Sequence, residues 1–270
     1  MTTLLGLDAF RWVAIVAALL AVLVVVESWM GHYRSGFPLR SQYAPLVGGG
    51  ALVLSCLAAA AMPDIGWASR ALRVSGWIAI ALGVIGVGYH HYYGIVEKAG
   101  GYRWLLHYLM YGAPQLAPLA LTTAGALGVA ASYGLAGDGT PIGVEPSRIL
   151  LGIVAISLAG AVAQSGILHY RGAFNTPFMY LPLVLPPVAA IGAAWLAFAP
   201  ASGLASTVRV LLWATFLIGF IGLGMHLRGI DRQMGGVHLF SFNVLQGPPP
   251  LAPGVFAALA AVGILALGAA

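Results

Sequence analysis

The sequence predicts an all-α integral membrane protein of about eight transmembrane helices, built as a tandem duplication of a four-helix unit. Three observations predict this fold class. The 270 residues are 60% hydrophobic and only 7% charged, with a mean hydropathy of +0.94, whereas soluble domains carry about 25% charged residues. Long apolar runs recur along the chain, and residues of the first half reappear in the second half at a nearly constant offset.

The charge and cysteine content exclude several classes of protein. The net charge of +5 does not indicate a nucleic-acid partner, because the 12 Lys and Arg residues are dispersed and form no basic stripe. The single cysteine, Cys56, excludes a disulfide framework, a cysteine-ligated iron–sulfur cluster and a covalent haem-attachment motif. The first apolar run has no basic segment before it and no cleavage site after it, so we expect a retained helix.

Eight segments have the roughly 20 mostly apolar residues that a spanning helix needs. In order, they are 11–32, 44–62, 72–92, 104–133, 149–169, 178–199, 206–226 and 250–269. Clusters of Pro, Gly, Arg and Asp separate them and act as helix breakers. The fourth segment is overlong and contains Pro114 and Pro118, so we expect its start to lie outside the hydrocarbon layer or to kink at the prolines.

The repeat divides the chain into two units, 1–137 and 138–270. Residues 27–34 (ESWMGHYR) align without a gap with residues 164–171 (QSGILHYR), an offset of 164 − 27 = 137. Arg73 and Trp77 match Arg209 and Trp213 at an offset of 209 − 73 = 136, one residue shorter. Each unit has an even number of helices, so both copies share one orientation and are related by a pseudo-two-fold axis along the membrane normal.

The basic residues predict how the chain is oriented. Loops after odd-numbered segments carry Arg34, Arg40, Lys98, Arg103, Arg171, Arg228 and Arg232; the other side carries Arg11, Arg70, Arg73, Arg148 and Arg209. Seven basic residues against five favour a cytoplasmic location for the odd loops. We expect the protein to lie in a bacterial cytoplasmic (inner) membrane.

All seven histidines fall at the odd-loop end. His32, His90, His169 and His226 occupy the same place in four segments, near the last apolar turn. Polar side chains inside membrane helices are costly and indicate function. Four repeat-related imidazoles on one side of the membrane can ligate a metal or haem iron.

The neighbouring residues favour haem. Gly86 precedes His90 by four residues, as Gly222 precedes His226, so each glycine shares a helix face with a histidine and leaves room for a flat macrocycle. Arginines follow three of the histidines by two residues, at positions suited to haem propionates; they are Arg34, Arg171 and Arg228. Tyr33 and Tyr170 suit the interfacial belt, or a hydrogen bond to a propionate or a quinone.

We therefore expect two b-type haems, one per unit, with axial ligand pairs His32/His90 and His169/His226. Pairing across the pseudo-two-fold axis is an alternative, and His91, His107 and His238 are alternative ligands. Three other interpretations stay open. Small residues four apart often mean close helix packing, interfacial His and Arg often anchor helix ends, and a non-haem metal also accepts imidazoles.

Glu27 is the acidic residue placed within the apolar segments, and its repeat equivalent is Gln164. We expect this position to hydrogen-bond a quinone or relay a proton, with an interhelical polar contact as the alternative. The sequence contains no arrangement of nucleophile, base and acid, so we predict no catalytic residues.

The layout of two four-helix bundles resembles the quinone-reactive NrfD/PsrC membrane subunits of molybdenum oxidoreductases. It is also similar to haem A synthase, a duplicated eight-helix protein with four haem-ligating histidines. Both resemblances are architectural. Haem A synthases usually place a glutamate three residues before a histidine on an even helix, whereas Glu27 lies five before His32 on an odd one. Subunits of the NrfD type usually need no haem.

These features predict a haem b-binding, quinone-interacting electron-transfer subunit that anchors a peripheral dehydrogenase, reductase or cytochrome subunit of a respiratory oxidoreductase. The loops are too small for a separate catalytic domain, so we expect a non-catalytic subunit rather than a self-contained enzyme. The alternatives are a cofactor-free structural subunit of a larger complex, a small-solute transporter, and a membrane enzyme acting on a lipid or porphyrin.

Overall fold

The computed structural model describes residues 7–138, 140, 142–199 and 201–269, and these residues form helices and connecting turns without a β-strand. The long helices are α1 (Ala9–Arg34), α2 (Ala44–Ala61), α3 (Gly66–His91), α5 (Leu119–Ala136), α6 (Pro146–Arg171), α7 (Leu181–Phe198) and α8 (Ser202–Asp231). The shorter helices are α4 (Leu105–Tyr111), α9 (Phe240–Gln246) and α10 (Gly254–Ala269). Single turns form η1 (Arg40–Tyr43), η2 (Tyr92–Val96), η3 (Gly101–Trp104), η4 (Pro177–Tyr180) and η5 (Gly236–Leu239).

Within these described residues, seven helices are long and apolar enough to cross a membrane, which indicates an integral membrane protein. They correspond to the first seven expected segments. Large apolar side chains on their outer faces are exposed, among them Leu54 (71%), Ile156 (78%) and Phe198 (83%). Such a surface is compatible with contact to lipid.

The fourth and eighth expected segments differ from the prediction. Segment 104–133 is not one helix, because the chain unwinds at 112–118 around Pro114 and Pro118 and separates α4 from α5. Proline removes a helical hydrogen bond and clashes with the preceding turn, so the predicted interruption is confirmed and is complete. Segment 250–269 begins only at Gly254, after the unwound stretch 247–253. Helix α10 has 16 residues and is about 24 Å long, short of the roughly 30 Å hydrocarbon layer.

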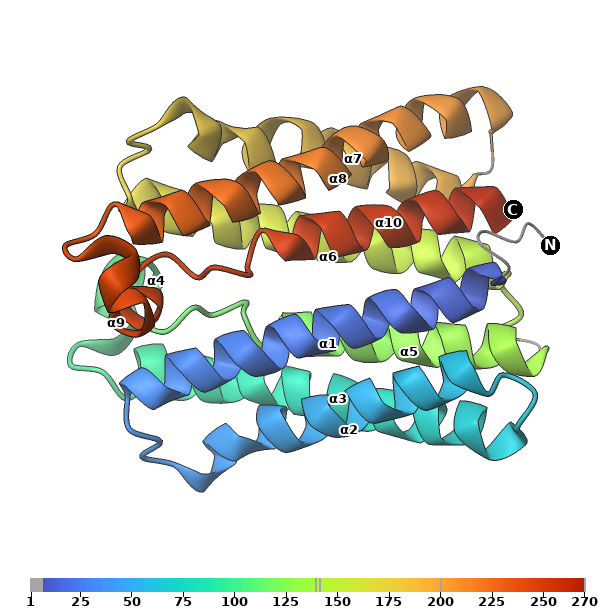
Figure 1. Ribbon diagram of the computed structural model, residues 1–270, viewed down its shortest axis with the longest axis horizontal. Coiled ribbons are helices and arrows are strands. Elements are labelled where there is room, and N and C mark those ends of the chain that lie inside the picture. The colour runs from blue at the N-terminus through green and yellow to red at the C-terminus, as the bar shows by residue number, and fades with distance from the viewer. Residues whose placement is uncertain (1–6, 139, 141, 200, 270) are drawn as a thin grey trace.

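The seven long helices and α10 pack as two layers, α1, α2, α3 and α5 in the first and α6, α7, α8 and α10 in the second (Figure 1). In the first layer α2 and α5 each pack against both α1 and α3, so α1 and α3 occupy opposite corners. In the second layer α7 and α10 each pack against both α6 and α8, which are again opposite corners. The layers meet where α1 packs against α10 and α5 against α6.

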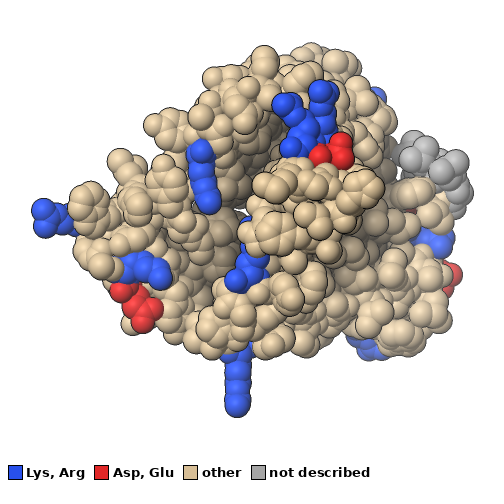
Figure 2. All heavy atoms as spheres, turned by 60° about the vertical axis from the view of Figure 1, so that its left-hand side comes forward, with Lys and Arg blue, Asp and Glu red and all other residues tan. Residues whose placement is uncertain are grey.

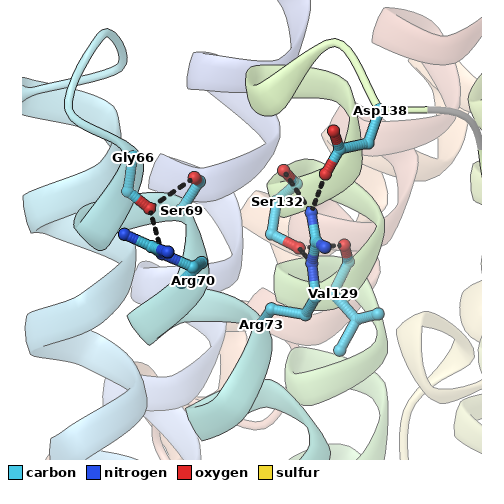
Figure 3. Close-up of polar contacts among 7 residues, drawn as sticks. All are labelled: Gly66, Ser69, Arg70, Arg73, Val129, Ser132 and Asp138. Carbon is cyan, nitrogen blue, oxygen red and sulfur yellow. Dashed lines mark hydrogen bonds and ion pairs between the residues drawn. The ribbon is translucent and has the colours of Figure 1, made fainter.

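The end of the bundle away from the histidines is held by arginines that bind the last carbonyl groups of neighbouring helices. Arg11 Nε donates to Ala60 O, and Arg148 Nε donates to Ala197 O, each at 2.8 Å. Arg73 lies between α3 and α5, where it donates to Ser132 and pairs with Asp138 at 2.7 Å (Figure 3). Unsatisfied C-terminal carbonyls carry partial negative charge, so these arginines satisfy both hydrogen bonding and charge.

The two ends of the bundle differ in charge. The histidine end carries seven basic residues and two acidic ones, Glu97 and Asp231. Figure 2 looks toward this end and shows basic side chains scattered over it. The opposite end carries five arginines against Asp8, Asp64, Asp138 and Glu145. The net charge is therefore +5 at the histidine end and +1 at the other.

Candidate functional site

The candidate site consists of two pairs of histidines at one end of the bundle. His32 on α1 faces His90 on α3, with ring centroids 6.4 Å apart and planes at 71°. His169 on α6 faces His226 on α8, also at 6.4 Å and with planes at 68°. Both pairs join helices at opposite corners of a layer, so the rings meet across the interior of that layer. The structure thus brings together the two pairs expected within the units.

Each of the four rings is oriented by a backbone carbonyl. The Nδ1 atoms of His32 and His169 bind Gln42 O at 3.1 Å and Met179 O at 2.7 Å, in the turns that precede α2 and α7. The Nδ1 atoms of His90 and His226 bind Pro114 O at 2.9 Å and Pro249 O at 2.7 Å, in the two unwound segments. These carbonyls were not predicted, because a backbone partner in a loop leaves no residue-specific signal.

These hydrogen bonds fix the tautomer of the rings. A carbonyl oxygen only accepts, so each Nδ1 must carry the hydrogen and donate it. In a neutral imidazole the other nitrogen, Nε2, is then an unprotonated acceptor. This is the form in which histidine ligates metals, and metal-bound histidines almost always donate their second N–H to a carbonyl or carboxylate.

The ring-centre separation in each pair can be compared with that of two imidazoles bound on opposite sides of one metal ion. An imidazole–metal bond of about 2.0 Å, plus roughly 1.2 Å from nitrogen to ring centre, separates two rings on opposite sides of an ion by about 6.4 Å. Both observed pairs have that separation. The agreement holds in each half of the chain.

The donor set of each pair consists of two imidazoles. Across the described residues no group of three or more His, Cys, Asp or Glu side chains is placed to hold a metal ion. Protein zinc and non-haem iron sites need at least three side-chain ligands. A haem needs only the axial ones, because the macrocycle supplies the rest. Each pair offers two imidazoles, the number of axial ligands that a six-coordinate haem takes from the protein.

The alternative ligands lie outside the two pairs. His91 Nε2 binds the Tyr102 hydroxyl at 2.6 Å. The His107 ring packs beside Tyr108 and Tyr111 on α4, with centroid distances of 5.4 and 5.2 Å. His238 lies in the turn η5 and is exposed.

Gly86 and Gly222, the glycines that precede His90 and His226, lie against prolines of neighbouring segments. A Cβ atom on Gly86 would lie 2.9 Å from Pro118 Cβ, and one on Gly222 would lie 2.7 Å from Pro253 Cβ. Their missing side chains therefore make room for the chain entering α5 and α10. Close packing of helices against small residues therefore accounts for the contacts of both glycines in this structure.

Glu27 and Gln164 make interhelical contacts across the two layers. Glu27 Oε1 accepts the N–H of Leu251 at 2.8 Å, and Gln164 Oε1 accepts the N–H of Leu116 at 3.2 Å. Each acceptor lies on one layer and satisfies the unwound segment of the other. Unwound backbone at membrane depth requires such partners.

The arginines and tyrosines that follow the histidines are exposed at the same end. Arg34, Arg171 and Arg228 all lie in the last turn of their helices. Arg171 is 6.0 Å from the centre of the Tyr111 ring, which belongs to the first half of the chain. Tyr33 stacks on Trp29 at 5.2 Å and is 53% exposed, while Tyr170 is 66% exposed.

Two aromatic pairs border the site and were missed in the sequence. Phe37 stacks on Tyr43 at 4.6 Å, and Phe174 stacks on Tyr180 at 4.5 Å. Both phenylalanines have positive φ, 50° and 47°, and lie edge-on to the rings of His32 and His169. The signal was present in the repeat, because these residues match at the offset of 137.

Comparison of the chain with protein-family models, with curated proteins and with solved structures gave no match.

Proposed function

We propose that the protein is a haem b-binding, quinone-interacting electron-transfer subunit of a membrane oxidoreductase. The observation that carries this proposal is the pair of histidine sites with ring centres 6.4 Å apart, each ring having its Nδ1 on a carbonyl. His32 and His90 would hold one haem, and His169 and His226 a second. A bound haem would supply reversible one-electron chemistry.

The chain's own residues would position this group and control its surroundings. The four carbonyl bonds hold the rings so that Nε2 is free to act as ligand. Arg34, Arg171 and Arg228 lie beyond the histidines at the water interface, where guanidinium groups suit propionates. Glu27, Gln164, Tyr33 and Tyr170 offer hydrogen bonds to a quinone.

The proposed architecture is an eight-helix tandem duplication, with units 1–137 and 138–270 and a pseudo-two-fold axis along the membrane normal. Equivalent contacts support it, since the hydrogen bonds of His32 and His169, and of Glu27 and Gln164, correspond residue by residue. We place the protein in a bacterial inner membrane, with the histidine end in the cytoplasm.

A peripheral dehydrogenase, reductase or cytochrome subunit would bind the histidine end. Apolar side chains there are exposed outside the spanning helices, including Leu106 (77%), Tyr111 (64%) and Met234 (91%). Exposed apolar patches of this kind are typical of protein interfaces. Substrate chemistry would then belong to the partner.

An absorption spectrum of the purified protein, oxidised and then reduced with dithionite, tests the proposal. We expect a Soret band, split α and β bands on reduction, and two b-type haems per chain by the pyridine haemochrome assay. A protein extracted gently from its native membrane that shows neither a Soret band nor a haemochrome contradicts it.

The unwound segments 112–118 and 247–253 favour a second candidate, a small-solute transporter. Discontinuous helices in equivalent positions of duplicated halves form substrate sites in transporters. Solute uptake into proteoliposomes by a colourless protein would support this candidate. A colourless protein without uptake that copurifies with a larger complex would instead indicate a structural subunit.

A further inference from the structure

Glu27 and Gln164 perform the same structural task with different chemistry. The carboxyl group of Glu27 is hydrogen-bonded to the backbone of Ala252 as well as that of Leu251. One of these contacts is shared by both positions, because each Oε1 atom accepts a backbone N–H from the unwound segment of the other layer, Leu251 for Glu27 and Leu116 for Gln164. Gln164 shows that a neutral carbonyl oxygen is sufficient for this contact. The contact to Leu251 therefore does not require an ionisable group.

The surroundings of Glu27 contain few other ionisable groups. Helix α1 packs against α2, α5, α9 and α10, and residues 240–269 contain no Asp, Glu, Lys, Arg, His, Cys or Tyr. Helix α2 contributes Cys56, and α5 contributes Tyr133, which lies against Arg73 at the opposite end of the bundle. Cys56 is five residues from the end of α2 that lies beside Arg11.

On α1 itself, the groups nearest along the chain are His32 and Arg34. Arg34 lies seven residues beyond Glu27, about two helical turns closer to the water at the histidine end. A carboxyl group within a spanning helix is costly to keep as an isolated charge. Glu27 is thus an acidic residue within the apolar part of α1, five residues from His32 on the side away from the water.

We infer that Glu27 is a proton-binding site within the membrane, present in the first half of the chain and replaced by an amide in the second. It takes up one proton from water at the histidine end when the centre held by His32 and His90 gains one electron. A chemical reductant or quinol would supply the electron, and a haem held by His32 and His90 would accept it. The bond that forms is the O–H bond of the neutral carboxyl group.

Coupling to the electron rests on the proposed function, whereas proton binding by Glu27 does not. Infrared difference spectroscopy of the full-length protein therefore tests proton binding first. The protein is titrated from alkaline to neutral pH. We expect a carboxylic C=O stretch to appear in this range, to be absent from Glu27→Gln, and to persist in the matched control Glu97→Gln.

Glu27→Gln reproduces the side chain that already makes the equivalent contact at position 164, so we expect it to fold. If it does not, ¹³C-labelling of glutamate in the unaltered protein gives the same information, because the only other glutamates, Glu97 and Glu145, are exposed. A band that is absent, that survives Glu27→Gln, or that fails to shift with labelled glutamate overturns the inference.

Redox titration at several pH values tests the coupling. We expect the midpoint potential of one centre to fall as pH rises, approaching the limit of about 59 mV for each tenfold change in proton concentration. Glu27→Gln should abolish this slope and leave the second centre unchanged. Two potentials that are both independent of pH overturn the coupling, although the proposed function stands. If the protein binds no haem, the proposed function is wrong, and the infrared experiment still tests proton binding by Glu27.

Discussion

At the scale of the residue, one hydrogen bond determines what each histidine can do. The carbonyls of Pro114 and Pro249 belong to unwound segments that need a donor at membrane depth, and His90 and His226 supply it. This structural task uses only Nδ1. The Nε2 atoms remain as acceptors, and the ring centres of each pair are 6.4 Å apart.

Double variants test which histidines share a centre. We expect His32→Ala with His90→Ala to retain one haem, because both substitutions empty the same site. His32→Ala with His169→Ala should retain none, since each site then lacks a ligand. The haemochrome assay on purified protein measures the ratio of haem to chain.

The exposed histidine of α4 provides the control, because His107→Ala should keep both haems. The reverse pattern in the double variants would mean that the ligands pair across the pseudo-two-fold axis. Loss of haem from His107→Ala would place α4 in the site and contradict the assignment.

At the scale of the element, glycines determine how closely α3 approaches α5. A Cβ atom on Gly83 would lie 2.7 Å from Thr122 N and 2.8 Å from Pro118 O, and it would also contact Thr122 Oγ1. Backbone atoms at these distances cannot move aside without shifting the helix. Gly88, five residues further along the same helix, has no such neighbour within 4 Å.

Gly83→Ala should therefore destabilise the protein by about 1–3 kcal/mol, the usual cost of overpacking a well-packed contact. Gly88→Ala is the matched control and should be neutral or slightly stabilising, because alanine favours the helix. Thermal unfolding in mild detergent, followed by circular dichroism, measures both variants. Equal stabilities of the two would contradict the packing assigned to Gly83.

The helices could be predicted to different extents from the sequence, and the prolines explain the difference. Hydropathy identifies apolar segments but does not distinguish an apolar helix from an apolar extended stretch. The helices in segments 104–133 and 250–269 were therefore predicted too long, although Pro114, Pro118 and Pro253 lie in the stretches that are not helical. The repeat predicted the histidine pairs, whereas the carbonyl partners depend on how loops return to the bundle and leave no pattern in the sequence.

At the scale of the whole molecule, the basic residues at the two ends of the bundle differ in their contacts. At the end away from the histidines, Arg11, Arg73 and Arg148 donate to backbone carbonyls, and Arg73 also forms an ion pair. No ion pair forms at the histidine end between residues that the structure describes. The basic residues there are exposed, and the net charge of that end is four units more positive, +5 against +1. Exposed Lys and Arg residues close to helix ends favour the cytoplasmic side.

Labelling of single cysteines tests this orientation. Cys56, the only native cysteine, is fully buried, so the unaltered protein should not react with a membrane-impermeant maleimide. With Cys56 replaced by alanine, Lys98→Cys at the histidine end should react in inverted membrane vesicles but not in intact cells. Asp64→Cys, in the exposed turn between α2 and α3, should show the opposite pattern. Labelling of Lys98→Cys in intact cells would place the histidine sites, and any partner that receives their electrons, on the outer side of the membrane.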